Sequence, residues 1–92
     1  MGAGLKKAPG LVAMALEIHL AAALRSVVPD YNPRAGLSME VEPGTSIMEI
    51  MRILGIDQRQ VKMVMVNGKA ALKETILSGE ERVGLFPPVG GG

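Results

Sequence analysis

Apolar and polar residues alternate in two segments of the N-terminal half of the chain. Residues 16–20 read Leu-Glu-Ile-His-Leu, and residues 37–41 read Leu-Ser-Met-Glu-Val. A period of two places all the apolar side chains of a strand on one face. The two segments therefore predict two strands, each with one buried face. Residues 25–36 between them are rich in proline, asparagine, aspartate and glycine, which predicts a long hairpin loop.

The next segment predicts a helix from about Ser46 to Leu54. Ser46 and Glu49 have the spacing of a capping box, in which each side chain accepts a hydrogen bond from the other residue's amide. Apolar residues spaced at i, i+3, i+4 and i+7 form one stripe, which we expect to pack on a sheet. The stripe consists of Ile47, Ile50, Met51 and Leu54. Gly55 suits the left-handed conformation that often ends a helix.

The C-terminal half predicts three further strands. Residues 61–66 are apolar on both faces apart from one lysine, as expected for a central strand. Asn67-Gly68 predicts a tight turn directly after it. A short strand at residues 70–72 and a last strand at residues 83–86 complete the order strand, strand, helix, strand, short strand, strand.

The composition indicates one small domain with an aliphatic core. The 92 residues suffice for a single domain, and 48% hydrophobic with 21% charged residues is typical of a globular chain. Tyr31 and Phe86 are the only aromatic residues, so aliphatic side chains and some of the seven methionines must fill the core. The net charge of +1 includes no basic block, which argues against nucleic acid as a partner. Without cysteine, disulfides, thiolate metal sites and a cysteine nucleophile are excluded.

The chain divides into three predicted parts. We interpret residues 1–13 as a disordered extension, because they are rich in small residues and lack periodicity. Residues 14–86 form the predicted domain, and residues 87–92 a flexible tail. The apolar run after Lys7 resembles a secretory signal, but Glu17 and His19 interrupt it. A membrane span needs about 20 apolar residues, so we expect a cytoplasmic protein without a membrane partner.

The end of the chain carries its most specific motif. Residues 84–92 read Gly-Leu-Phe-Pro-Pro-Val-Gly-Gly-Gly. Together with the element order and Val66-Asn67-Gly68, this ending resembles the MoaD/ThiS family, the sulfur carriers of molybdopterin and thiamin biosynthesis. The resemblance covers about residues 16–92. It implies an α+β fold of the β-grasp (ubiquitin-like) type, with a mixed sheet of four or five strands packed on one main helix.

Two further features are similar to those of the family, and two differ from it. The serine-capped helix and Leu24-Arg25, predicted at the end of the first strand, both match. The family usually has Gly-Asp before its last strand, whereas Gly79 is followed by Glu80 here. Small residues around Ala21 replace the aromatic residue often found in the first strand.

The resemblance implies a function for the C-terminal residues. A partner adenylating enzyme of the ubiquitin-activating type would adenylate Gly92, and sulfur would then convert it to a thiocarboxylate that serves a sulfur-accepting synthase or large subunit. ATP and magnesium would be used by the partner, and this chain would bind no cofactor or metal. Gly91 has no Cβ, like Gly92, so the end of the chain can enter a narrow channel. The predicted partner-binding residues are Phe86, Pro87, Pro88, Val89 and Gly90.

Several alternatives remain open. Pro-Pro-Val favours the molybdopterin branch, whereas the triple glycine is closer to some thiamin-branch endings. The same activated end could instead join this chain to a lysine of another protein, as in a ubiquitin-like modifier, or the chain could be a non-catalytic interaction module. An enzyme is least favoured, because no nucleophile-base pair, metal-ligand cluster or phosphate loop is visible.

The positions of four side chains are also predicted from the pattern. Phe86 either joins Val89 in an exposed docking patch or packs in the core. Met48 and Ile53 flank the helix stripe, and we expect both to be partly buried. His19 is expected to be a solvated strand residue without a catalytic role.

Overall fold

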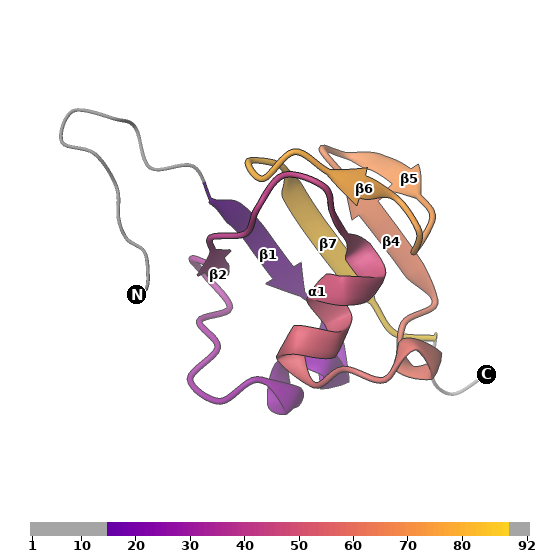
Figure 1. The fold of residues 1–92 in the computed structure, drawn as a ribbon. Coiled ribbons are helices and arrows are strands. Elements are labelled where there is room, and N and C mark those ends of the chain that lie inside the picture. The colour runs from indigo at the N-terminus through magenta and orange to yellow at the C-terminus, as the bar shows by residue number, and fades with distance from the viewer. Residues whose placement is uncertain (1–14, 89–92) are drawn as a thin grey trace, which may run out of the picture.

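A five-stranded mixed sheet forms the centre of the computed structural model, which describes residues 15–88 (Figure 1). The strands lie in the order β2-β1-β7-β4-β5. Their bounds are Leu16–Leu20 (β1), Leu37–Met39 (β2), Met63–Val66 (β4), Lys69–Ala71 (β5) and Arg82–Phe86 (β7). β1 and β7 pair in parallel, and every other pairing in this sheet is antiparallel. The first and last strands of the described chain are therefore neighbours in the middle of the sheet.

The helix α1 (Ile47–Leu54) covers one face of this sheet (Figure 1). The Ser46 hydroxyl accepts a hydrogen bond from the Glu49 amide at 3.1 Å, as predicted. The Glu49 carboxylate instead pairs with Arg52, so only half of the predicted capping box forms. Gly55 ends the helix with φ of 78°, in the left-handed region. A second, two-stranded antiparallel sheet pairs β3 (Thr45–Ser46) with β6 (Ile76–Leu77).

The core between α1 and the sheet consists of aliphatic side chains and one methionine. Its members are Leu16, Ile18, Leu20, Leu24, Ile47, Ile50, Met51, Ile56, Val61, Val64, Leu77, Val83 and Leu85. Met48 and Leu54 pack partly against this core. Ile53 does not, because its side chain lies on the far side of the helix and is 57% exposed, so the prediction that it is partly buried is wrong.

This arrangement is the β-grasp fold. A mixed five-stranded sheet, with its parallel pair in the centre, packs one face against a single helix. The predicted fold class is thus confirmed. The turn Asn67-Gly68 has φ of 51° and 82° and joins β4 to β5, as predicted. The strand predicted at residues 61–66 begins at Met63 and is an interior strand, with β7 on one side and β5 on the other.

The segment after β1 differs most from the prediction. The sequence predicts Leu24-Arg25 at the end of the first strand, but β1 ends at Leu20 and a 3₁₀-helix, η2 (Ala22–Val27), follows. The chain turns sharply at Ala22, where φ is 52°. Alternation of polar and apolar residues stops at Leu20, and the helical turn allows Leu24 to reach the core. A second 3₁₀-helix, η3 (Gln58–Gln60), precedes β4 and begins at a capping box of Asp57 and Gln60.

The predicted division of the chain falls largely outside this description. Residues 1–13 and 89–92 lie outside the described residues, so the disordered extension and the flexible tail stay predictions. Among residues 15–88, no helix is both long and apolar enough to cross a membrane.

Candidate functional site

Hydrogen bonds from both neighbouring strands hold β7 in the sheet up to Phe86, the last residue of the strand. Leu85 accepts a hydrogen bond from the Ala21 amide at 3.1 Å, on the β1 side. Phe86 accepts one from the Lys62 amide at 2.7 Å, on the β4 side. Pro87 and Pro88 follow, and because proline has no amide hydrogen, they cannot extend the sheet. The chain therefore leaves the sheet at a fixed point, between β1 and β4.

The structure describes three of the seven predicted site residues. Phe86 ends β7, Pro87 is half-buried beside it, and Pro88 is exposed. The others lie outside the described residues: Val89, Gly90, Gly91 and Gly92. The structure thus describes the point at which the chain leaves the sheet, and the predicted reactive residues follow that point.

Phe86 lies on the face of the sheet opposite α1, which we call the outer face. Val83 and Leu85 are fully buried toward the helix, and Phe86 alternates with them. Its ring folds back over Gly84, where an added Cβ would lie 3.1 Å from the Phe86 Cε1 atom. Gly84 therefore makes room for the ring. Of the two alternatives for Phe86, core packing is wrong, and the ring is half-buried on a surface that α1 does not cover.

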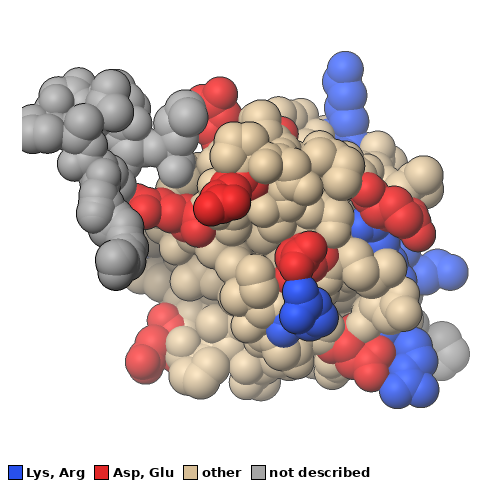
Figure 2. Space-filling view, viewed as in Figure 1, with Lys and Arg blue, Asp and Glu red and all other residues tan. Residues whose placement is uncertain are grey.

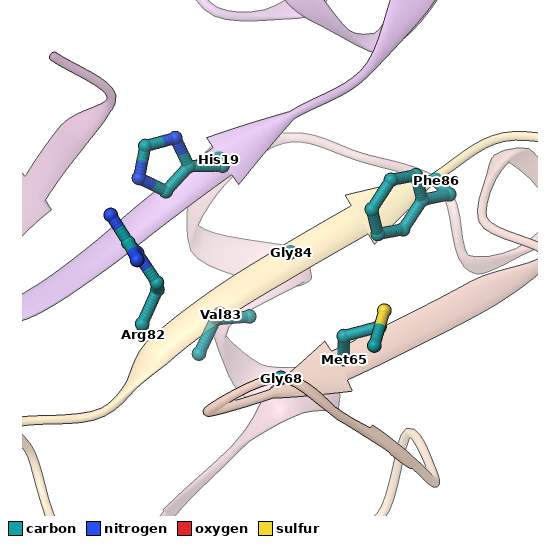
Figure 3. Close-up of a pocket in the computed structure, with 7 residues that line it drawn as sticks. All are labelled: His19, Met65, Gly68, Arg82, Val83, Gly84 and Phe86. Carbon is teal, nitrogen blue, oxygen red and sulfur yellow. The ribbon is translucent and has the colours of Figure 1, made fainter.

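A shallow hollow of about 260 Å³ lies beside this ring on the outer face (Figure 3). Three strands contribute side chains to it, and its lining includes His19, Met65, Gly68, Arg82, Gly84 and Phe86. A second depression contains Met63 and Leu72, which are 44% and 72% exposed. The outer face thus presents apolar side chains next to the point where the chain leaves the sheet. Such a surface suits contact with another protein.

Three charged or ionisable side chains lie at the polar edge of the hollow. The Glu17 carboxylate lies 2.5 Å from His19 Nε2 and 3.0 Å from Arg82 Nη2. The hydrogen bond with His19 has the largest effect on the pKa of Glu17, followed by that with Arg82, and both lower it. His19 also packs against Gly36, where an added Cβ would lie 2.9 Å from its Cε1 atom. His19 lies on the outer face of β1, the strand position predicted for it, and its side chain is 32% exposed and paired with Glu17.

Glu81 shapes the turn that leads into β7. Its carboxylate accepts hydrogen bonds from the amides of Ser78, Gly79 and Glu80 at 2.8, 3.0 and 3.2 Å. Burial raises the pKa of Glu81, but the bonds from the Ser78 and Gly79 amides outweigh this effect and the pKa is lowered. The sequence shows an acidic residue before the last strand, but not that it closes the turn. Glu81 thereby fixes the start of the strand that carries the C-terminal residues.

The described residues do not form a metal site. Within residues 15–88, no three or more His, Asp or Glu side chains lie close enough together to hold an ion. What this part of the molecule offers is a fixed chain exit beside an apolar surface.

Residues 18–92 match the ThiS family, including the C-terminal residues beyond the described part of the structure. The chain belongs to the ThiS family. No curated protein matches the sequence. Proteins of the ThiS family are ubiquitin-like sulfur carriers that typically work with an activating enzyme and are generally non-catalytic. The β-grasp fold of this chain agrees with membership of that family.

Solved structures share the fold of this ThiS-family protein. A crystal structure of the small archaeal modifier protein SAMP1 from Haloferax volcanii superposes with a TM-score of 0.63 and 22% identity, covering 85% of this chain and 99% of that one. The solution structure of the HVO 2177 protein, also from Haloferax volcanii, gives a TM-score of 0.65 and 24% identity. That comparison covers 99% of this chain and 100% of the other. Both are similar in fold.

Proposed function

We propose that this protein is a sulfur carrier that reacts through the carboxylate of Gly92. The main support is that the match to the ThiS family runs through residue 92, while the structure ends β7 at Phe86 between two strands. The residues that would react thus follow the last strand of the sheet. A partner enzyme can then engage the end of the chain without unfolding the sheet.

The chemistry requires activation of a poor acylating group. The Gly92 carboxylate attacks the α-phosphorus of ATP, and pyrophosphate leaves, which gives an acyl-adenylate. A persulfide sulfur of the partner system then attacks the acyl carbon, and AMP leaves. Reduction of the resulting acyl disulfide by a thiol releases the thiocarboxylate on Gly92. ATP and magnesium belong to the partner in this scheme, and the carrier contributes the acyl group.

The residues just before the terminus favour one branch of the family. Pro87-Pro88-Val89 resembles the molybdopterin branch, so a sulfur-accepting synthase or large subunit of that pathway is the preferred acceptor, ahead of one in thiamin synthesis. Proline also limits the conformations that the segment must lose when it binds. The outer face, with Phe86 and Met65, is the surface that we assign to partner contact.

A second function uses the same activated end. SAMP1, which is similar in fold, is described as a small archaeal modifier protein. In that case a lysine amine of another protein would attack the acyl-adenylate of Gly92, and an isopeptide bond would form with loss of AMP. The two functions differ only in the nucleophile that receives the acyl group.

Mass spectrometry of the terminal peptide distinguishes these functions. The protein is incubated with its activating enzyme, ATP, magnesium and a sulfur donor, and is then cleaved after Arg82. The released peptide, Val83 to Gly92, contains no methionine. Replacement of oxygen by sulfur therefore cannot be confused with methionine oxidation, which has the same nominal mass change.

We expect this peptide to carry one sulfur that mild hydrolysis removes. A peptide joined to a lysine of another protein would instead support the modifier function, and an unmodified peptide would contradict both. A C-terminal tag that masks Gly92 is the control. It should abolish the change but leave the melting temperature unaltered, because the described core ends at Leu85.

A further inference from the structure

Two positively charged side chains flank the point where the chain leaves the sheet. Lys62 lies on the β4 side, with its amide bonded to the Phe86 carbonyl oxygen. Arg25 lies on the β1 side, in η2, and lines a notch of about 180 Å³ together with Phe86. Its Nε donates to the Leu20 carbonyl oxygen at 3.1 Å, which fixes the position of the guanidinium group. β7 therefore ends between two cations.

Neither cation is neutralised by the described part of the chain. The ion pairs among residues 15–88 engage His19, Arg52, Arg59 and Arg82. Glu74 lines the same depression as Lys62 but forms no ion pair with it. Both Arg25 and Lys62 are exposed. They remain available to a carboxylate that another molecule supplies.

The acidic N-cap residue of η3, Asp57, is already engaged in an ion pair. The Arg59 guanidinium group lies 2.9 Å from the Asp57 carboxylate. The side-chain hydrogen bond from Arg59, and after it the hydrogen bond from the Arg59 amide, lower the pKa of Asp57 to about 2. Lys73 adds another positive charge to this end, where its Nζ donates to the Gln58 carbonyl oxygen at 2.8 Å. The positive charges around the chain exit thus exceed the free negative ones.

The opposite end of the sheet carries three glutamates. β1 and β7 are parallel, so they begin at the same end, where Glu17, Glu80 and Glu81 lie. Arg82 pairs with Glu17 there, and Lys69 lies at the same end, at the start of β5. On the face shown in Figure 2, the side near β2 carries acidic side chains alone, whereas Lys and Arg lie over α1 and toward β4 and β5, with further acidic side chains among them.

We propose that Arg25 and Lys62 dock with carboxylates that flank the channel entrance of the activating partner. This inference rests on the proposed function. The two cations would steer the chain end toward the entrance, because exposed complementary charges accelerate association. They would also hold the exit point of β7 over the channel while the apolar outer face packs alongside.

The length of the remaining chain favours a protein surface over the nucleotide as the ligand. Six residues, 87–92, follow β7. When extended they span about 20 Å, which is far more than the reach of a lysine or arginine side chain. With the tail inserted, the adenylate on Gly92 lies well beyond Arg25 and Lys62. The cations then face the rim of the channel.

Charge reversal tests this inference. Lys62→Glu and Arg25→Glu are compared with Lys69→Glu, a matched control in which an exposed lysine at the opposite end of β4 and β5 is changed. The probe is the ubiquitin-activating-type enzyme of the same organism. Association is measured by stopped-flow fluorescence, and adenylation separately by ATP-pyrophosphate exchange. The association rate is therefore obtained even when Gly92 does not react.

We expect Lys62→Glu and Arg25→Glu each to slow association about tenfold at low salt, with a smaller loss at high salt and an unchanged kcat. Lys62→Arg should restore the wild-type rate, and Lys69→Glu should match it. Equal rates for all variants, or a lower kcat with unchanged association, would overturn the inference. Binding without adenylation of the wild type would contradict the proposed function while the docking result still stands on its own. Because Arg25 bonds to the backbone, its variant counts only if its melting temperature is retained, and Lys62→Glu decides the result otherwise.

Discussion

A loop tyrosine completes the hydrogen bonding of β1. β2 pairs with β1 only from Leu16 to Ile18, so Leu20 has no strand on that side. Its amide donates instead to the Tyr31 hydroxyl at 2.8 Å. An amide that lost this acceptor would be left partly buried and unpaired, which costs free energy. The long loop after η2 is thereby tied to the end of the strand beside the chain exit.

Tyr31→Phe should therefore destabilise the domain by about 1 kcal/mol. The ring keeps its packing, and only the hydroxyl that accepts from Leu20 is lost. Urea denaturation followed by circular dichroism measures the change, and amide hydrogen exchange should show faster exchange at Leu20. An unchanged unfolding free energy with unchanged exchange would mean that the hydroxyl is dispensable.

Two isoleucines of α1 provide a matched test of the core. Ile50 is fully buried, whereas Ile53 is 57% exposed on the same helix. Ile50→Ala should cost about 2–5 kcal/mol, because it leaves a cavity, and Ile53→Ala should stay within about 0.5 kcal/mol of the wild type. Chemical denaturation of both variants checks this. Similar losses of unfolding free energy in the two variants would contradict the orientation of α1 in the structure.

At the scale of elements, the turn before β7 depends on one ionised group. The Glu81 carboxylate accepts from three successive amides, and its pKa is lowered. A lowered pKa in the folded state means that the group contributes stability above its unfolded pKa of about 4.3. This contribution is lost as the pH falls through the lower folded value.

Glu81→Gln should therefore reduce stability at neutral pH and flatten the loss of stability below about pH 4.3. The measurement is the unfolding free energy from urea titrations at a series of acidic pH values. Glu80→Gln is the control, since that side chain accepts none of the three amide bonds. If Glu80→Gln flattens the pH dependence equally, Glu81 is not the group responsible.

Elements with a strong local pattern could be predicted from the sequence, and others could not. β1 follows an alternation of five residues, and α1 has both a cap and an apolar stripe. β3 and β6 have two residues each, too few for any period to be visible. η2 begins with Ala22 at positive φ, a conformation that alanine seldom adopts and that the sequence pattern does not predict.

At the scale of the whole molecule, the buried core of the described chain runs from Leu16 to Leu85. A protein that starts at Met14 should accordingly fold, with a melting temperature close to that of the full chain, and should still be adenylated. Differential scanning calorimetry and pyrophosphate exchange test the two points. A large loss of stability would show that residues 1–13 pack on the domain.

The candidate site could be predicted only where it is contiguous in sequence. The C-terminal motif was visible because its residues follow one another. The grouping of Glu17 with Arg82 depends on the parallel pairing of β1 with β7, which joins positions 65 residues apart. Likewise, Arg25 and Lys62 flank the end of β7 because one lies on its β1 side and the other on its β4 side. Long-range pairing leaves no periodic signal in a single sequence.

The pairing of β1 with β7 also bears on how this protein is made. A ribosome releases β1 early and β7 last, and without β7 the sheet is divided into two separate strand pairs, β1 with β2 and β4 with β5. The nascent chain therefore cannot complete its fold during most of its synthesis. Prematurely terminated products that lack β7 should stay unfolded and be open to proteolysis. Folding thereby acts as quality control, because the molecules that survive to meet the activating enzyme have been translated at least through Phe86.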